Sequence, residues 1–358
     1  MSTKHLLNLV GDRLRTLPIL VLYLTDGCNS RCVTCDIWRN PRRNMKLELV
    51  EALAGELKPL AVRQIVLSGG EAMQHPKWPE IARRFRAEGV RVSLLTNGLL
   101  LRKQIDEVLA SVDEVIVSLD GGTAATYEAI RGVDGFDLIL EGIKLVRAGG
   151  IPVTTRTTVQ QANYREIPQI IEAAKSVDVN SISFLTVDVS NPFAFGERFQ
   201  SADFRAHIPL IATMGADAPI EHGPPASALT AADVTELAQI LDGVEARFAA
   251  DFASGRIAES PAKLRRMVSY FGAILHQDEF PHVRCNAPHL STIIEVDGSL
   301  RPCYFLPRMG KVNGIPLHEA INSPDALELR RAYRAGERAE CQSCVCPLYK
   351  GGRSLLRI

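Results

Sequence analysis

Three cysteines lie close together near the start of the chain, at Cys28, Cys32 and Cys35. Three thiolates at this spacing can reach one metal centre. A structural zinc ion usually takes four protein ligands, and no histidine lies close enough in the sequence to supply the fourth. A 4Fe–4S cluster held by three cysteines instead leaves one iron open for a small molecule. The triad therefore predicts an iron–sulfur site with an open coordination position.

A second group of cysteines lies in the last quarter of the chain. Its members are Cys285, Cys303, Cys341, Cys344 and Cys346. The sequence shows no export signal, so we expect the reducing cytoplasm, where structural disulfides are rare. Clustered cysteines in that compartment indicate metal or cluster ligands. These cysteines could hold either an iron–sulfur cluster or the zinc ion of a zinc ribbon.

The elements that position the first triad follow a regular rhythm, in which apolar β-rich runs alternate with amphipathic helical segments. The strands are expected over residues 19–25, 64–68, 91–96, 114–119, 153–159 and 181–187. Alternation of this kind predicts parallel βαβ units wound into a barrel or an open sheet. Both architectures place their sites where the carboxyl ends of the strands meet. The cysteine triad and several glycine turns follow strand ends, so we expect them at that edge.

The flanking segments have a different character. Residues 4–17 predict an amphipathic helix with Leu6, Leu7, Val10 and Leu14 on one face, packed under the first domain or lying on a lipid surface. Residues 231–252 and 261–275 predict helices, the first capped by Thr230. Residues 291–296 predict a strand that enters a hairpin turn.

The overall charge and hydropathy exclude some classes of protein. The chain has 41 Lys and Arg against 41 Asp and Glu, so its formal net charge is zero and no basic field draws it to nucleic acid. No apolar run is long enough to span a bilayer.

The triad, three strand-end motifs and a later Arg131-Gly132 pair together resemble the radical S-adenosylmethionine (SAM) superfamily. The motifs are Cys28-Asn-Ser-Arg-Cys32-Val-Thr-Cys35, Ser68-Gly69-Gly70-Glu71, Thr96-Asn97-Gly98, Ser118-Leu119-Asp120-Gly121 and Arg131-Gly132. The resemblance implies that Cys28, Cys32 and Cys35 ligate a 4Fe–4S cluster that binds SAM. It further implies a set of cofactor-binding residues, with Glu71 near the amino group and Arg156 near the carboxylate of SAM. The set is Gly69, Gly70, Glu71, Asn97, Ser118, Asp120, Arg131 and Arg156.

The second cysteine group resembles the SPASM and Twitch domains of the same superfamily. The resemblance implies one auxiliary 4Fe–4S cluster with four ligands, Cys285, Cys303, Cys341 and Cys344. Cys346 is then left over. It is a spare thiol, an alternative ligand to Cys344, or a catalytic donor of a hydrogen atom to a substrate radical.

The resemblance implies an α/β fold, a partial (β/α)6 TIM-type barrel with a C-terminal auxiliary iron–sulfur domain. The expected parts are an N-terminal helix (1–17), the barrel (18–190), a helical linker (191–281) and the Twitch-like domain (282–358). The implied activity is reductive cleavage of SAM to a 5′-deoxyadenosyl radical, which takes a hydrogen atom from a substrate. The implied electron donor is a flavodoxin or ferredoxin.

The substrate class is left open by the sequence. We expect a small molecule (a sugar, an aminocyclitol or another natural-product intermediate) that is oxidised or epimerised, because no leader-binding domain precedes Cys28. The alternative is a maturase that modifies a peptide or protein. A non-catalytic electron carrier conflicts with the glycines and Glu71, which a carrier has no need of.

Overall fold

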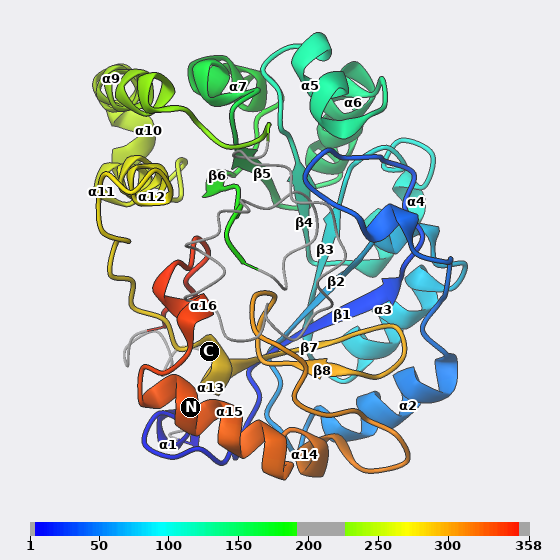
Figure 1. The fold of residues 1–358 in the computed structure, drawn as a ribbon. Helices are drawn as coiled ribbons and strands as arrows, with labels where there is room; N and C mark the ends of the chain where they lie inside the picture. Colours follow the sequence, from blue (N-terminus) through cyan, green and yellow to red (C-terminus); the bar gives the residue numbers. More distant parts are fainter. Residues whose placement is uncertain (1–3, 192–225, 351–358) are drawn as a thin grey trace.

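The computed structural model describes residues 4–191 and 226–350, which form an α/β fold around one eight-stranded sheet (Figure 1). The strand order is β6-β5-β4-β3-β2-β1-β7-β8. Every neighbouring pair is parallel except β7 and β8, which are antiparallel. The strands are β1 Ile19–Thr25, β2 Gln64–Gly69, β3 Arg91–Thr96, β4 Glu114–Ser118, β5 Val153–Val159, β6 Ser181–Thr186, β7 Ser291–Ile294 and β8 Leu300–Arg301. The sheet curves but does not close, which confirms the predicted partial barrel.

The helices that follow the strands cover the outer face of the sheet, as the arc from α2 to α7 in Figure 1 shows. They are α2 Leu47–Glu56, α3 Trp78–Ala87, α4 Ile105–Ser111, α5 Ala124–Arg131, α6 Phe136–Ala148 and α7 Ile167–Ser176, with single 3₁₀ turns η1 Ile37–Arg39, η2 Ala72–Gln74 and η3 Tyr164–Glu166. A second set follows later in the chain: α9 Ala231–Arg247, α10 Ala249–Ala253, α11 Pro261–Leu264, α12 Arg266–Ile274, α13 Ala287–Leu290, α14 Leu317–Ala320, α15 Pro324–Arg334 and α16 Ala339–Gln342. No helix among the described residues is long and apolar enough to cross a membrane.

Alternating burial along the strands shows which side chains face the inside of the barrel. In β5 the side chains of Val153, Thr155, Thr157 and Val159 are buried, whereas the side chain of Arg156 is only half-buried. Because successive side chains of a strand point to opposite faces, the buried set packs under the helices. Arg156 therefore faces the interior of the barrel, at the level of Ser118 on β4 and Ser183 on β6.

The sequence predicts the barrel strands to within one residue at each end, but it fails at the N-terminus. The predicted helix over 4–17 is wrong beyond Leu7, because α1 spans only Lys4–Leu7. The Asn8 side chain closes a loop instead: its amide donates to the carbonyl oxygens of Thr16 (2.8 Å) and His289 (3.0 Å). This segment also carries the carbonyl of Asp12, which accepts a hydrogen bond from the fully buried Arg330 of α15 (3.0 Å). It thus packs against α13 and α15.

The later segments join the barrel more closely than the sequence predicts. The hairpin strand β7 pairs in parallel with β1, with Ile19 opposite Ser291 and Leu22 opposite Ile294, so it extends the barrel sheet. The predicted Thr230 cap of α9 is confirmed, and forms a capping box with Asp233. Residues 192–225 of the predicted linker lie outside the described residues, and the domain limits stay predictions.

Candidate functional site

The cysteine triad lies on the loop that leaves the carboxyl end of β1. The loop is held to the end of α5 by two backbone hydrogen bonds, from Arg31 N to Arg131 O (2.9 Å) and from Val33 N to Ile130 O (3.0 Å). Burial, with a smaller contribution from the neighbouring cysteines of the triad, raises the pKa of Cys28 to about 11 and that of Cys35 to about 12. Such thiols stay protonated until a cation stabilises the thiolate form. The loop therefore carries three cysteine thiols that lie within electrostatic reach of one another.

The glycine turn after β2 lies against the start of the cysteine loop. Gly70 N donates to Thr25 O and Glu71 N donates to Gly27 O, each at 2.8 Å. A Cβ atom placed on Gly70 would lie 2.3 Å from Gly27 O, which is far inside van der Waals contact. Only glycine fits at this position, because the two backbones pass directly against each other.

Glu71 joins the β2 turn to the end of β3. Its fully buried carboxylate accepts hydrogen bonds from Met73 N (3.1 Å), Thr96 Oγ1 (2.9 Å) and Asn97 N (2.8 Å). Burial raises the pKa of Glu71, although all three donors oppose this shift. Both carboxylate oxygens are thus already engaged by the protein. The predicted contact of Glu71 with the amino group of SAM stays a prediction.

Asn97, at the end of β3, reaches the cysteine loop directly. Its buried amide donates to Asn29 Oδ1 (2.8 Å) and Ser30 Oγ (3.1 Å), and lies 3.9 Å from Cys28 Sγ. The structure therefore brings Asn97 together with the first cysteine of the triad.

Arg131 and Asp120 form a buried ion pair beside the second cysteine. An Arg131 terminal nitrogen lies 2.6 Å from Asp120 Oδ2, and the other donates to Cys32 Sγ at 3.5 Å. Asp120 Oδ1 in turn accepts from Thr158 N at 2.7 Å. None of the described residues is a hydrogen-bond partner of the buried Nε of Arg131.

Ser118 and Arg156 are neighbours across β4 and β5. No described residue pairs with the guanidinium of Arg156, and its Nε is buried without a hydrogen-bond partner. Its positive charge acts on Cys346, where it opposes the rise in thiol pKa that burial causes. The structure therefore places Arg156 near the leftover cysteine of the second group.

The second cysteine group comes together from separate segments. Cys285 precedes α13, Cys303 follows β8, Cys341 lies in α16 and Cys344 follows α16. Burial raises the pKa of Cys303 and of Cys341 to about 12, and the charges of Cys341 and Cys285 raise that of Cys303 further. Burial also raises the pKa of Cys344, and among the smaller causes are the charges of Cys285 and Cys303. All four predicted ligands thus lie within electrostatic reach of one another.

Comparison with known families identifies both cysteine sites. Residues 22–187 match the family model described as the radical SAM superfamily, and residues 285–345 match the SPASM model, described as an iron–sulfur cluster-binding domain. The chain is a radical SAM protein with a C-terminal SPASM-type domain. The radical SAM domain implies a 4Fe–4S cluster and SAM, and the SPASM domain implies auxiliary iron–sulfur binding.

Curated relatives match part of the chain. The AdoMet-dependent heme synthase of Methanosarcina barkeri is 36% identical over 167 residues, which cover 45% of this chain and 48% of the relative. A probable GTP 3′,8-cyclase of Saccharolobus islandicus is 34% identical over 176 residues, which cover 48% of this chain and 57% of the relative. The chain thus spans about half the length of the curated relatives it matches.

Solved structures match nearly the whole fold. Streptococcus suis SuiB bound to SAM covers 97% of this chain, with 76% of its own chain matched, at a TM-score of 0.63 and 15% identity. The anSMEcpe enzyme with bound AdoMet and a peptide covers 87% of this chain, with 82% of its own chain matched, at a TM-score of 0.61 and 17% identity. At this identity the likeness shows the fold alone.

The residues of the radical SAM domain fit the implied cluster and cofactor. The triad supplies three thiols on one loop, and beside them the Nε of Arg131 is a buried donor with no partner in the part of the chain that the structure describes. Across residues 4–191 and 226–350, no three Cys, His, Asp or Glu side chains converge as the ligands of a single metal ion do. Cysteines around one zinc ion lie about 4 Å apart, because each Zn–S bond is about 2.3 Å. A cluster spreads its cysteines over separate irons, so its ligands need not converge on one point.

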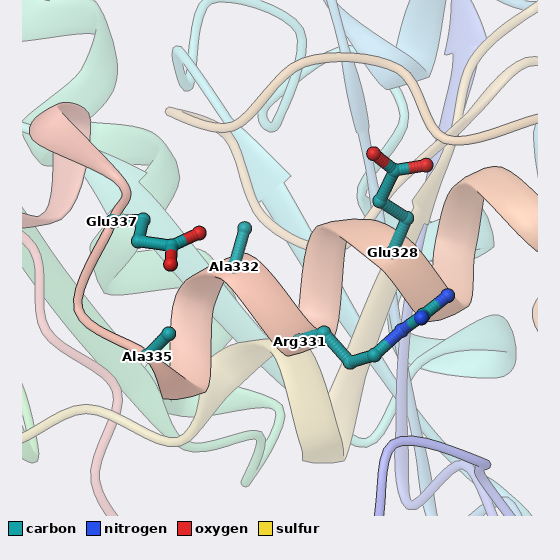
Figure 2. A pocket seen from close by; sticks show the side chains of 5 residues that line it. All are labelled: Glu328, Arg331, Ala332, Ala335 and Glu337. Carbon is teal, nitrogen blue, oxygen red and sulfur yellow. The ribbon is translucent and has the colours of Figure 1, made fainter.

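Two surface pockets have no cysteine in their lining. One, of about 440 Å³, is lined by Glu328, Arg331, Ala332, Ala335 and Glu337, all from α15 and the turn after it (Figure 2). The other, also of about 440 Å³, lies beside α6 and α7, and Gly122, Phe136 and Gln169 are among the residues that line it. Neither includes a residue predicted to hold the cluster or SAM.

The sequence reasoning missed two features that connect the sites. Tyr23 of β1 is buried, and burial is the main cause that raises its pKa. Cys35 and Cys303, one from each cysteine group, are among the smaller causes, so both groups act on this side chain. Ser190 Oγ lies 3.1 Å from Ser343 Oγ, inside the Cys341–Cys344 segment, and ties the end of β6 to the SPASM domain. Only the inward position of Tyr23 on its strand could have drawn attention to it.

Proposed function

We propose that this radical SAM protein cleaves SAM reductively and removes a hydrogen atom from a small-molecule substrate. The observation that carries the proposal is the packing of two strand-end turns and the end of α5 against the Cys28–Cys35 loop. The glycine turn of β2 abuts the start of the loop, the β3 turn reaches Cys28, and Arg131 reaches Cys32.

Individual residues of the chain would have the following roles. Cys28, Cys32 and Cys35 would hold the cluster through their sulfurs. Gly69 and Gly70 would leave backbone groups open to the methionine part of SAM, and Ser118 and Arg156 would face its carboxylate from inside the barrel. When bound, the cluster and SAM supply a 5′-deoxyadenosyl radical, while the protein orients the substrate C–H bond and excludes water.

The SPASM-type domain would hold an auxiliary 4Fe–4S cluster through Cys285, Cys303, Cys341 and Cys344. Four thiolate ligands leave no iron open, so this site would carry electrons rather than bind substrate. An electron donor such as flavodoxin or ferredoxin would supply the first site. The cytoplasmic setting stays a prediction.

Cys346 is proposed as a hydrogen-atom donor to a substrate radical. It is not among the four predicted cluster ligands, and the charge of the inward-facing Arg156 acts on its thiol. Cys346→Ala is therefore expected to keep the iron content and the cleavage of SAM, and to lose the epimerised product. Cys344→Ala is the matched control and should lose auxiliary iron. If Cys346→Ala loses the iron and Cys344→Ala keeps it, Cys346 is the ligand and the donor role is refuted.

Relatives in sequence support a small-molecule substrate. The names heme synthase and GTP 3′,8-cyclase belong to proteins that act on small molecules, and each protein matches a little under half of this chain. The fold neighbours favour the alternative of a peptide substrate, because SuiB is seen with its precursor peptide SuiA.

Deuterium transfer separates the two substrate classes. Extract from cells grown on deuterated medium is divided by ultrafiltration into small-molecule and polypeptide fractions, and each is incubated with the reduced enzyme and unlabelled SAM. Deuterium is expected in 5′-deoxyadenosine only with the small-molecule fraction. Label that appears only with the polypeptide fraction contradicts the small-molecule proposal.

A further inference from the structure

The carboxyl end of α5 is fixed to the cysteine loop by its backbone. The loop donates two hydrogen bonds to it, and Gly132 then ends the helix with a φ of +67°. A Cβ atom on Gly132 would lie 2.7 Å from Arg31 O, so the helix end and the loop are in close contact. Arg131, the last residue of α5, is therefore held at a fixed position beside the loop.

The guanidinium of Arg131 contacts a sulfur of the triad and is largely shielded from solvent. Its side chain is only 11% exposed, and it donates to Cys32 Sγ at 3.5 Å. Asp120 holds the other terminal nitrogen at 2.6 Å. Asp120 is itself fixed, because its Oδ1 accepts from Thr158 N and its carbonyl oxygen accepts from Asn163 Nδ2.

A fixed positive charge beside a ligand sulfur changes the balance between the redox states of a cluster. The reduced cluster carries one more negative charge than the oxidised cluster, so a nearby cation stabilises the reduced state more. Hydrogen bonds and charges at the sulfurs are among the factors that set cluster potentials. Because Arg131 is buried, solvent and salt screen its charge only weakly.

We propose that Arg131 is a positioning residue that raises the reduction potential of the Cys28–Cys32–Cys35 cluster through Cys32, and that Asp120 holds its guanidinium in place. The inference rests on the proposed function only in that this cluster must form. It predicts that the charge of Arg131, rather than its shape, makes the cluster easier to reduce.

The test measures the midpoint potential of the cluster whose EPR signal responds to SAM. The full-length protein is reconstituted anaerobically as wild type, Arg131→Gln and Arg131→Lys. Arg131→Gln is expected to lower the ratio of reduced to oxidised cluster about tenfold at a fixed potential, which is about 59 mV for one electron. Arg131→Lys keeps the charge and should stay near wild type. The matched control is Arg102→Gln, since Arg102 is exposed and pairs with Glu141 away from the loop.

Each outcome decides the proposal. A wild-type midpoint in Arg131→Gln with full iron content overturns it, as does an equal shift in Arg131→Lys and Arg131→Gln. If Arg131→Gln fails to hold iron, Asp120→Asn is the deciding variant. Loss of the carboxylate removes a negative charge and must raise the midpoint potential of the cluster. An unchanged or lowered midpoint potential overturns the proposal. A wild-type protein that binds no cluster at the triad refutes the proposed function itself, which is a separate result.

Discussion

Replacing Gly70 with alanine tests whether the β2 turn and the cysteine loop pack as closely as described. The new Cβ would meet three backbone atoms at once, at 2.3 Å from Gly27 O, 2.8 Å from Gly27 C and 3.0 Å from Asp26 O. Backbone cannot rotate away as a side chain can, so the two segments must separate. The hydrogen bond from Glu71 N to Gly27 O (2.8 Å) lies at the same point and would lengthen with them.

The expected loss follows from these contacts. Overpacking in a close-packed interior destabilises by about 1–3 kcal/mol, and a lengthened hydrogen bond adds about 1 kcal/mol. The φ of Gly70 is not in the left-handed region, so backbone strain contributes nothing and the effect is purely steric. Gly70→Ala should therefore lower the free energy of unfolding by about 2–4 kcal/mol and weaken SAM binding to the reconstituted protein.

Gly55→Ala is the matched control for this substitution. Gly55 lies within α2, and a Cβ there meets no heavy atom within 4 Å. Alanine in a helix is favoured over glycine by about 0.5–1 kcal/mol, so this variant should be more stable than wild type. Denaturant unfolding of the metal-free protein gives both values. Equal stability of Gly70→Ala and wild type, with SAM affinity unchanged, would refute the described packing.

Two further predictions concern buried ionisable groups. Glu71→Gln places amide hydrogens against at least one of the donors Met73 N, Thr96 Oγ1 and Asn97 N. The substitution should therefore lower the free energy of unfolding by about 1.5–3 kcal/mol in a denaturant titration. A smaller loss than in the exposed control Glu107→Gln contradicts the contacts described. Burial, assisted by Arg334 and Arg330, lowers the pKa of His289 to about 4, so the folded protein binds fewer protons than the unfolded chain between about pH 6.5 and 4. The free energy of unfolding should fall by about 3 kcal/mol as pH drops through that window. His289→Gln should remove this dependence of stability on pH, whereas the exposed control His318→Gln should keep it. An unchanged pH dependence in His289→Gln counts against a buried neutral imidazole.

The barrel strands could be predicted because their signal is local. In β1 and β5, runs of apolar and β-branched residues end at loops that carry polar or glycine residues, and the predicted bounds agree with the structure. The pairing of β7 with β1 could not be predicted, since Ile19 and Ser291 are far apart in the sequence and no local pattern marks a parallel partner. The N-terminal helix failed for a related reason. Apolar spacing suggested a helix to Leu17, whereas Asn8 closes a loop against His289, a contact that only the folded chain creates.

In the candidate site, too, the local features could be predicted from the sequence and the long-range contacts could not. The cysteine spacing and the glycine turn identify the loop from the sequence, because both are short and contiguous. The partners of individual side chains depend on tertiary packing. Glu71 is engaged by Asn97 and Thr96, and Arg131 reaches Cys32 across many intervening residues. Neither contact follows from motif spacing alone.

The most direct test of the account is anaerobic reconstitution with iron and sulfide, followed by reaction with SAM and a strong reductant. The wild type is expected to bind about eight irons per chain, because two 4Fe–4S sites are proposed, and to form 5′-deoxyadenosine and methionine. Cys32→Ala should abolish 5′-deoxyadenosine formation while it keeps the auxiliary iron. Zinc in place of iron, or no cleavage of SAM by the iron-loaded wild type, would contradict the central claim.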